Sequence, residues 1–227
     1  MFDPALLKLL QLSDSALPIG SYSHSWGLET WVQQGQLSSS DELLAVLRTL
    51  LEQSIAPVDG LACAMAYQAS ANRLGGPDFI QLNQILTATK WAKEPQRASL
   101  DLGRRLVSLA QRLDWLQELP PGQYWHHCTV FGWLTYQLNI AIEPAVTAYL
   151  LSNLMSLTSA AVRLIPLGHS QGQQVLAALH TQVFEQARWC CATAGRADPL
   201  THLGSFTPQH ELACQAHQNL YSRLFQS

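Results

Sequence analysis

The chain has 227 residues, a length at which a single hydrophobic core is stable on its own, so one domain is expected. Charged residues make up only 13% and apolar residues 48%, which excludes the low-hydrophobicity, high-charge composition of disordered chains. The formal net charge of −3 and the absence of a Lys/Arg cluster argue against a nucleic-acid partner. So sparsely charged a surface indicates that partners normally cover part of it.

The sequence shows no targeting or membrane segment. No stretch approaches 18 consecutive apolar residues, and the first residues lack the basic and apolar regions of a signal peptide. No membrane association and a cytoplasmic location are therefore expected. The five cysteines form no Cys-x-x-Cys pair and no even-numbered framework, which fits reduced thiols: Cys63, Cys128, Cys190, Cys191 and Cys214.

Residues 12–29 are the least ordinary part of the chain. Pro18 and Gly20 predict a turn, because proline fixes its own φ and glycine permits left-handed angles. Serines then alternate with Tyr22, His24 and Trp26, and a helix is expected to run from there to a stop at residue 35. Such a helix has little to bury in its first turns. Serine caps are one interpretation, and a recognition surface with Tyr22 and Trp26 one helical turn apart is the other.

From residue 39 onward the sequence predicts consecutive helices with short connections. Ser39 and Glu42 have the spacing of a capping box, and the apolar stripe that follows is expected to end at Pro57. Asp59 is expected to cap an alanine-rich helix closed by the glycines at 75 and 76. Further helices are predicted over 77–91, 93–113 and from 143, with another carrying apolar residues from 173. Glu94 and Arg97 have the spacing of an ion pair on one helix face.

Residues 124–136 are ambiguous, since aromatic and β-branched residues favour a strand by propensity. A single strand would have nothing to pair with, and the spacing of Cys128 and Gly132 would let two helices approach closely. A helix is therefore predicted. The Leu-Pro-Pro-Gly run at 119–122 is interpreted as a loop within one domain.

The last 33 residues differ in composition from the rest of the chain. Glycines and prolines punctuate residues 195–208, which predicts a flexible connection between a helical core (residues 1–194) and a C-terminal segment (195–227). That segment contains apolar residues four apart, which predict a tethered amphipathic helix: Leu212, Ala216, Leu220 and Leu224. Such a helix either docks on its own core or folds against another protein. The predicted fold is an all-α, single-domain bundle of about eight to ten helices.

Residues 168–172, Gly-His-Ser-Gln-Gly, match the nucleophile elbow of serine hydrolases, with Ser170 as the nucleophile. An aspartate and a histidine follow in the order of the α/β-hydrolases: Asp198, then His202, His210 or His217. The elbow requires a buried strand just before the serine, whereas residues 150–164 have the pattern of a helix. A serine hydrolase is thus the alternative interpretation, and a turn between helices bracketed by the two glycines is favoured.

The eight histidines do not form a clear metal site. Residues 126–128, His-His-Cys, are ligand types suited to zinc, copper or nickel, but adjacent helical side chains diverge by about 100°. His210 and His217 lie two helical turns apart, about 10 Å along the axis, and could share an ion only across a dimer interface. No carboxylate pair and no phosphate-binding loop are apparent. The sequence therefore predicts no catalytic residue, no metal ligand set and no cofactor.

Three segments resemble the urease accessory protein UreF family. They are Ala-Leu-Pro-Ile-Gly-Ser-Tyr-Ser at 16–23 with Gly-Leu-Glu at 27–29, Arg-Leu-Ile-Pro-Leu-Gly at 163–168, and His-Glu at 210–211 with Arg-Leu-Phe-Gln-Ser at 223–227. They occur in the family's order and span nearly the whole chain. Ile19 in place of valine and the His24-Ser25-Trp26 run depart from the commoner pattern, which affects the details of contacts.

The resemblance implies a non-catalytic scaffold in the maturation of nickel-containing urease. Such proteins bind the accessory protein UreD (also called UreH), dimerise, and recruit the GTPase UreG, and the complex delivers nickel to apo-urease. The tail is then expected to dock on a partner. Partner contacts are expected from two groups of residues: Pro18, Gly20, Tyr22, His24, Trp26 and Glu29 near the start, and His210, Glu211, Arg223, Leu224 and Phe225 in the tail. The Arg223 guanidinium can pair with a carboxylate of a partner.

Overall fold

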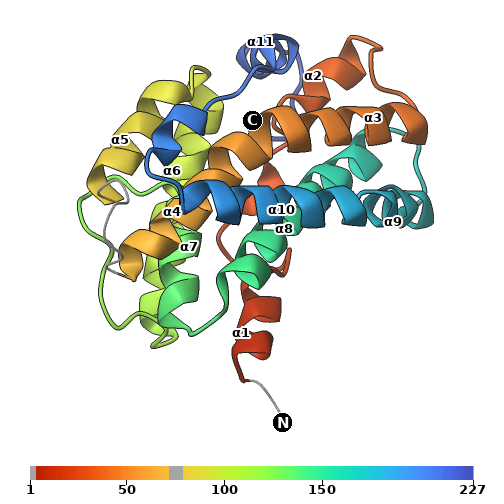
Figure 1. The fold of residues 1–227 in the computed structure, drawn as a ribbon. Helices are drawn as coiled ribbons and strands as arrows, with labels where there is room; N and C mark the ends of the chain where they lie inside the picture. The colour runs from red at the N-terminus through yellow and green to blue at the C-terminus, as the bar shows by residue number, and fades with distance from the viewer. Residues whose placement is uncertain (1–3, 72–78, 227) are drawn as a thin grey trace.

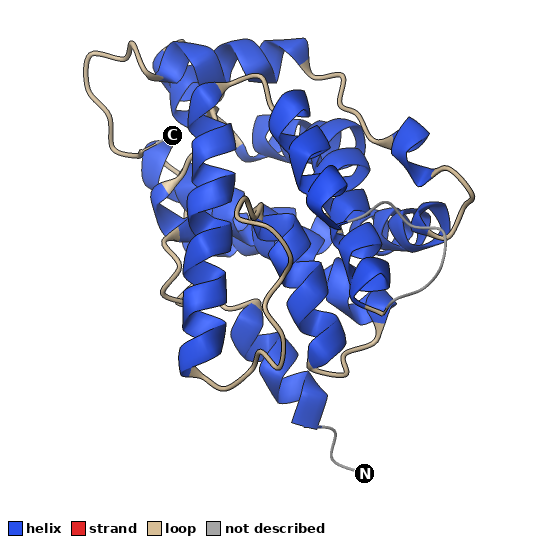
Figure 2. Cartoon of the chain, turned by 90° about the vertical axis from the view of Figure 1, so that its left-hand side faces the viewer, coloured by secondary structure: helices blue, strands red, loops and turns tan. Residues whose placement is uncertain are grey.

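The computed structural model describes residues 4–71 and 79–226, and over these residues it contains helices and no strand (Figure 1, Figure 2). The prediction of an all-α single domain is confirmed. The first half contains α1 (Pro4–Leu12), the 3₁₀ turn η1 (Ser21–Ser23), α2 (Leu28–Gln33), α3 (Ser40–Leu50), the π-helix η2 (Leu51–Gly60), α4 (Leu61–Ser70), α5 (Phe79–Thr89) and α6 (Lys93–Arg112). The second half contains α7 (His127–Gln137), α8 (Ile142–Leu164), α9 (His169–Ala178), α10 (His180–Ala194), the 3₁₀ turn η3 (Pro199–His202) and α11 (Pro208–His217).

Helices α3, η2 and α4 form one continuous helical run. The predicted capping box is present, because the Ser39 hydroxyl accepts from the Glu42 N–H and the Glu42 carboxylate accepts from the Ser39 N–H. The prediction that Pro57 ends the helix is wrong. Pro57 lies inside η2, where the wider π turns change which carbonyl faces the proline ring. Asp59 is likewise not a cap, since its carboxylate forms an ion pair with Lys90 at 2.9 Å.

The centre of the core is the contact between α4 and α7, and both helices are rich in small buried residues. A Cβ atom on Gly132 would lie only 2.0 Å from the Cys63 carbonyl oxygen, so the two backbones touch at a point where only glycine fits. This confirms a helix within residues 124–136 and the close approach that the Cys128–Gly132 spacing predicted. The stretch predicted to close one helix and open the next, at 75–78, lies outside the described residues.

Helix α8 runs through the middle of the bundle and packs on α7, α9 and α10. Among the described residues it is the one helix whose length and composition would allow it to cross a membrane. Half of its most apolar window is buried inside the molecule, as expected of a core helix. The helix predicted from residue 173 is divided at Leu179 into α9 and α10, and its apolar positions Val175, Leu179 and Val183 are buried as expected.

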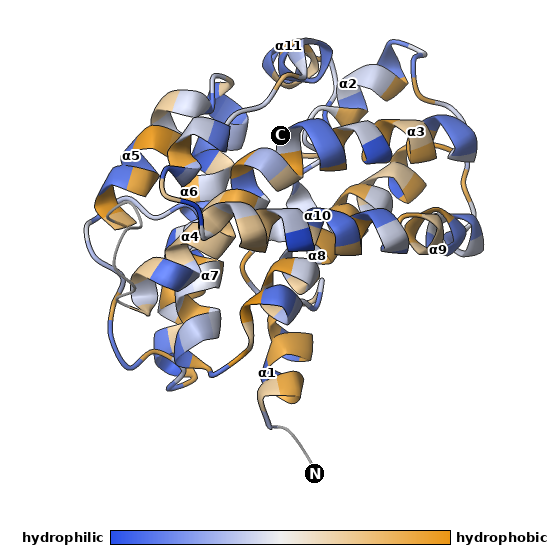
Figure 3. Ribbon diagram, viewed as in Figure 1, coloured by the Kyte–Doolittle hydropathy of each residue, from blue (hydrophilic) through white to orange (hydrophobic). Residues whose placement is uncertain are grey.

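Helix α1 projects from the bundle and is largely hydrophobic in colour (Figure 3). Leu9 and Leu12 pack against the core, whereas Leu6, Leu7 and Leu10 are more than half exposed. An apolar face of α1 is therefore left open to solvent or to a partner.

The C-terminal segment packs on its own chain, where α11 contacts α2 and α6. The connection before it is anchored, because the Phe206 N–H donates to the Gln53 carbonyl. The predicted stripe of leucines is wrong. Helix α11 ends at His217, so Leu220 and Leu224 lie beyond it, and Leu212 is exposed. Helix α11 buries Ala213, Cys214 and His217. The small side chains of Ala213 and Cys214 let the helix lie close to α2.

Candidate functional site

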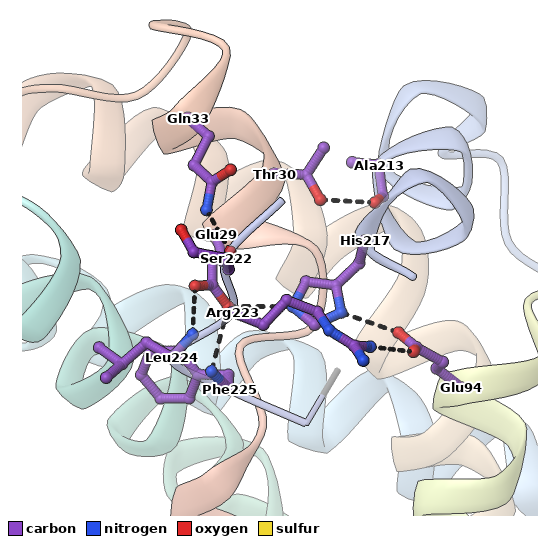
Figure 4. A network of polar contacts seen from close by, with 10 residues as sticks. All are labelled: Glu29, Thr30, Gln33, Glu94, Ala213, His217, Ser222, Arg223, Leu224 and Phe225. Carbon is purple, nitrogen blue, oxygen red and sulfur yellow. Dashed lines mark hydrogen bonds and ion pairs between the residues drawn. The ribbon is translucent and has the colours of Figure 1, made fainter. Parts of the chain in front are cut away.

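Residues expected to contact partners lie at 18–29 and at 210–225, and the structure places these two segments side by side (Figure 4). We call residues 218–226, which follow α11 without helical structure, the strap. The strap crosses α2 and returns to the 3₁₀ turn η1, where the Gln226 N–H donates to the Ser23 carbonyl at 2.9 Å. The Gln33 side-chain amide donates to the Ser222 carbonyl at 2.9 Å. Two segments far apart in the sequence therefore form one surface.

Glu29 is the centre of this arrangement. It lies in the first turn of α2 and is only 2% exposed. Its Oε1 accepts from the Leu224 N–H at 2.6 Å, and its Oε2 accepts from the Phe225 N–H at 3.1 Å and faces His217 Nε2 at 3.0 Å. A buried carboxylate is stable only when it is paired and hydrogen-bonded, and Glu29 meets both conditions through the C-terminal residues alone.

His217 links Glu29 to a second carboxylate. The ring is fully buried, and its Nδ1 lies 2.9 Å from Glu94 Oε2 in the first turn of α6. The other Glu94 oxygen pairs with the Arg223 guanidinium at 3.3 Å. The predicted pair between Glu94 and Arg97 is wrong, because Glu94 turns toward the tail and Arg97 lies near Asp101. We call Glu29, Glu94, His217 and Arg223 the polar seam.

Backbone conformation fits α11 against the start of α2. Trp26 and Gly27 both have positive φ, at 50° and 82°. This turns the Trp26 carbonyl toward His210, whose Nε2 lies 2.8 Å away. A side chain on Gly27 would meet Cys214, so glycine is needed here for space as well as for φ. The Thr30 hydroxyl donates to the Ala213 carbonyl at 2.8 Å, and burial lowers the pKa of His210.

Arg163, at the end of α8, was not identified as a site residue from the sequence. Its guanidinium donates to the Tyr22 carbonyl at 2.9 Å and lies over the Phe225 ring, 4.6 Å from the ring centroid. Tyr22, Arg163 and Phe225 belong to the three different segments that resemble the family, so Arg163 connects all three. The available signal was its position in the second of these motifs, although nothing local indicated its partners.

The expected contact residues divide into buried and exposed groups. His24, Glu29 and Phe225 are buried in the single chain, and His210 and Glu211 are partly buried, with Glu211 accepting from the Ser205 hydroxyl. Those open to a partner are Pro18, Tyr22, Arg223 and Leu224. Gly20 has the left-handed φ of 90° that the turn requires. The expected helical spacing of Tyr22 and Trp26 is wrong, since η1 ends at Ser23 and α2 begins at Leu28.

The hydrolase elbow is absent. Ser170 lies in the first turn of α9, which follows a loop after α8, and no strand precedes it in the described residues 4–71 and 79–169. The interpretation of residues 168–172 as a nucleophile elbow is therefore wrong, because the strained turn that exposes the nucleophile needs a strand and a sheet.

No group of three His, Cys, Asp or Glu residues in the described part of the chain has the geometry to hold a metal ion. His126 is buried between Thr87 and Ser99, and His127 packs on Phe131 and Tyr149. Burial lowers the pKa of each of these histidines to about 4, so both are neutral at pH 7.

A cavity of about 140 Å³ lies between α1, η2, α8 and the start of α11. Its walls include the Asp59–Lys90 pair, His127, Tyr149 and several serines, together with apolar side chains such as those of Leu102 and Leu157. Two further carboxylates, Asp14 and Glu211, also line it, and its lining includes the exposed residues Asp14 and Trp91.

The fold and the surface that joins residues 22–33 to the strap define an all-α protein whose distinguishing residues fasten a C-terminal segment to the start of α2. A family model described as UreF matches residues 37–180. The chain is 31% identical over 230 residues to "Urease accessory protein UreF" of Bacillus sp. (strain TB-90), covering 98% of this chain and 99% of that protein. It is 32% identical over 234 residues to the protein of that name from Lachnoclostridium phytofermentans, covering 99% and 100%. The protein of that name from Kocuria rhizophila is 31% identical over 241 residues, with full coverage of both chains.

The chain therefore belongs to the UreF family of urease accessory proteins.

Proposed function

We propose that this chain is a non-catalytic, cytoplasmic scaffold for urease maturation, which binds UreD (UreH) and recruits the GTPase UreG for nickel delivery to apo-urease. Support comes from family membership, since the relatives are named urease accessory proteins. The described residues also contain neither a metal-ligand cluster nor a nucleophile elbow, so their distinctive features are surfaces.

The observation that carries the proposal is the set of exposed apolar side chains on the C-terminal segment. Leu224 is 65% exposed although its backbone is held by Glu29, and Tyr221, three residues earlier, is fully exposed. Phe206 and Leu212 are also exposed. Aromatic and leucine side chains held outward by an ordered backbone are typical of a protein interface, because they bury large area at little cost in chain entropy.

A second copy of the chain is the proposed occupant of the face of α1 that exposes Leu6, Leu7 and Leu10. This face lies on a helix that projects from the bundle, so two copies can meet there without disturbing the core (Figure 1). We infer a homodimer within the complex, and size-exclusion chromatography with light scattering tests it. Leu6→Ser with Leu10→Ser should give a monomer if α1 is the contact, whereas an unchanged dimer places the contact elsewhere.

The partner role of the tail is tested by co-purification with UreD. Tyr221→Ser with Leu224→Ser removes the exposed apolar groups and leaves the backbone anchors of the strap in place, so binding should fall while helical circular dichroism is unchanged. Phe184→Ser is the matched control, since Phe184 is half exposed on α10, away from the tail. Removing residues 209–227 should abolish co-purification as well. Wild-type binding by both variants would reject the tail as the UreD contact. The recruitment of UreG is tested in the same experiment, by asking whether a variant that still binds UreD has lost UreG from the complex.

A further inference from the structure

The cavity between α1, η2, α8 and the start of α11 plays no part in the proposed function. Its volume is about 140 Å³. Because a cavity of about 150 Å³ can hold benzene, this one can hold a group of about six non-hydrogen atoms. Asp14, Ser15 and Trp91 are exposed and belong to its lining, so the cavity opens to solvent.

The charged residues that line the cavity are mostly acidic. Lys90 is neutralised by Asp59, since its Nζ lies 2.9 Å from one oxygen of that carboxylate and 3.1 Å from the other. Asp14 and Glu211 add two more carboxylates, and no further Lys or Arg is present among the described residues of the lining. The cavity therefore favours a cation over an anion.

Asp14 and Glu211 each have a carboxylate oxygen available for a ligand. One oxygen of Asp14 accepts from the Ala16 N–H, and one oxygen of Glu211 accepts from the Ser205 hydroxyl. The second oxygen of each has no hydrogen-bond partner among the described residues. Since an ionised carboxylate accepts through both oxygens, each of these side chains can receive a further donor.

His127 supplies a neutral acceptor in the same cavity. Its ring packs on Phe131 and Tyr149, and neither ring nitrogen has a hydrogen-bond partner in residues 4–71 and 79–226. Burial lowers its pKa to about 4, so at pH 7 the ring is uncharged and carries one N–H and one lone pair. An uncharged ring does not repel a cation, and its lone pair can accept from one.

The rest of the lining suits a hydrocarbon chain. Trp26, Leu102 and Leu157 contribute apolar surface, and the exposed Trp91 lies where the cavity opens. Aromatic faces attract cations, and an aliphatic stem gains by burial against leucine. An uncharged apolar molecule would instead take water from the carboxylates and return no hydrogen bond.

We propose that this cavity binds a small organic cation, namely a primary ammonium or a guanidinium on a short aliphatic stem. Asp14 and Glu211 supply the net negative charge, the His127 lone pair accepts from the charged group, and Trp26 and the leucines pack on the stem. A free amine and a basic side chain of a partner protein present the same chemistry to these residues.

The test is a titration of the full chain with butylammonium chloride, which reproduces a lysine side chain, followed by nuclear magnetic resonance of the tryptophan indoles. The Trp26 and Trp91 signals should shift to saturation with a dissociation constant of about 1 mM, as expected for about five non-hydrogen atoms. Trp189 on α10 does not line the cavity and should not shift. Butanol and butyrate have a similar stem without the positive charge and should bind at least about tenfold more weakly. Equal affinity for butanol, or no saturable shift with butylammonium, would overturn the proposal.

A double variant isolates the two carboxylates. Asp14→Asn with Glu211→Gln removes both charges at nearly constant shape, so the affinity for butylammonium should fall about tenfold. Glu143→Gln with Glu185→Gln makes the same change of charge at exposed residues outside the cavity and should keep the wild-type affinity. Equal affinities in the two double variants would contradict the role of the carboxylates.

The acceptor is tested by His127→Phe, which keeps a ring beside Phe131 and Tyr149 and removes the lone pair. Binding of butylammonium should weaken while binding of butanol does not, and thermal unfolding checks that the variant is folded. Wild-type affinity for butylammonium in this variant would reject His127 as a ligand-binding residue.

The two sources of the cation are separated by co-purification with UreD. If a basic side chain of UreD enters the cavity, Asp14→Asn with Glu211→Gln should reduce co-purification and butylammonium should compete with UreD. If the source is a free amine, co-purification should be unchanged. This comparison rests on the proposed function, whereas the titration uses the chain alone, so a failure of one is distinguished from a failure of the other.

Discussion

The contact between α4 and α7 and the contact between α2, α6 and the tail are held by opposite means. At α4 and α7 the backbones touch at Gly132 and Cys63, and the surrounding residues are apolar and buried. At the polar seam, four charged side chains and a few hydrogen bonds hold a non-helical strap. Histidines mark the difference, since His126 in the core is neutral whereas His217 in the seam faces two carboxylates.

The difference shows which part of the molecule can move. The contact between α4 and α7 cannot open part of the way, because separating two helices whose backbones touch exposes the whole core. A strap held by a few hydrogen bonds and side-chain contacts can detach while every helix stays in place. The strap itself includes the exposed side chains of Tyr221 and Leu224. The part of the molecule that is proposed to bind partners is therefore the part that is easiest to release.

The largest effect is expected from Gly132→Val. Its Cβ would lie 2.0 Å from the Cys63 carbonyl oxygen, and backbone cannot move aside as a side chain can. We expect a loss of about 4 kcal/mol in the free energy of unfolding, or about 10 °C in melting temperature. Thermal unfolding followed by circular dichroism measures it. Gly204→Val is the control, since nothing lies within 4 Å of the position of a Cβ there. Equal melting temperatures for the two variants would refute the account of the core.

Glu29→Gln should release the strap and leave the core folded. The amide lacks the negative charge of the carboxylate and one of its two acceptor oxygens, and breaking a buried pair costs about 3 kcal/mol. The expected readout is trypsin cleavage after Arg223, whose rate should rise roughly a hundredfold because the open population rises by that factor. Glu185→Gln, at an exposed glutamate of α10, should leave the rate unchanged. Slow cleavage in Glu29→Gln would mean that other contacts hold the strap.

Acid should weaken the core through His126. Burial lowers its folded pKa to about 4, below the unfolded value of about 6.5, so the unfolded chain binds more protons between these values. Stability is therefore complete above about pH 6.5 and is lost as the pH falls toward 4, by about 2 kcal/mol at pH 4.5 for this residue. Urea unfolding at about pH 6.5 and at about pH 4.5 measures this loss in the free energy of unfolding. It should shrink by that amount in His126→Gln and persist in His180→Gln, and equal pH dependence in the two would contradict the assignment.

The smallest effect is expected from Arg163→Lys. Lysine keeps the charge over the Phe225 ring but replaces the planar guanidinium that also donates to the Tyr22 carbonyl. We expect a loss of about 1 kcal/mol in strap docking, seen as a several-fold faster cleavage after Arg223. Arg97→Lys, at a well-exposed arginine, should cleave at the wild-type rate. A wild-type rate in Arg163→Lys would show that the guanidinium contacts add nothing.

Local patterns predicted the local structure well. The capping box at Ser39 and Glu42 depends on residues three apart, and it is present. The continuation through Pro57 was missed because a π-helix has no clear signal in a single sequence. The buried face of α11 was missed because leucines attract attention, whereas Ala213 and Cys214 are what allow a close approach.

The polar seam was beyond sequence reasoning for a different reason. His217 lies 123 residues from Glu94 and 188 from Glu29, and no spacing rule connects side chains at such separations. The resemblance to a family predicted that Glu29 and Phe225 contact a partner, whereas both side chains are buried within this chain. That they bind each other within one chain follows only from the folded structure.

Native-state hydrogen exchange in low denaturant compares the two regions most directly. The Leu224 and Phe225 amides should exchange through a local opening, with a rate that hardly depends on denaturant, while the amides of α4 and α7 should exchange only through global unfolding, with the full denaturant dependence. Exchange of the strap and the core with the same free energy and the same denaturant dependence would show that the tail is an integral part of the core, and would contradict a separately releasable strap.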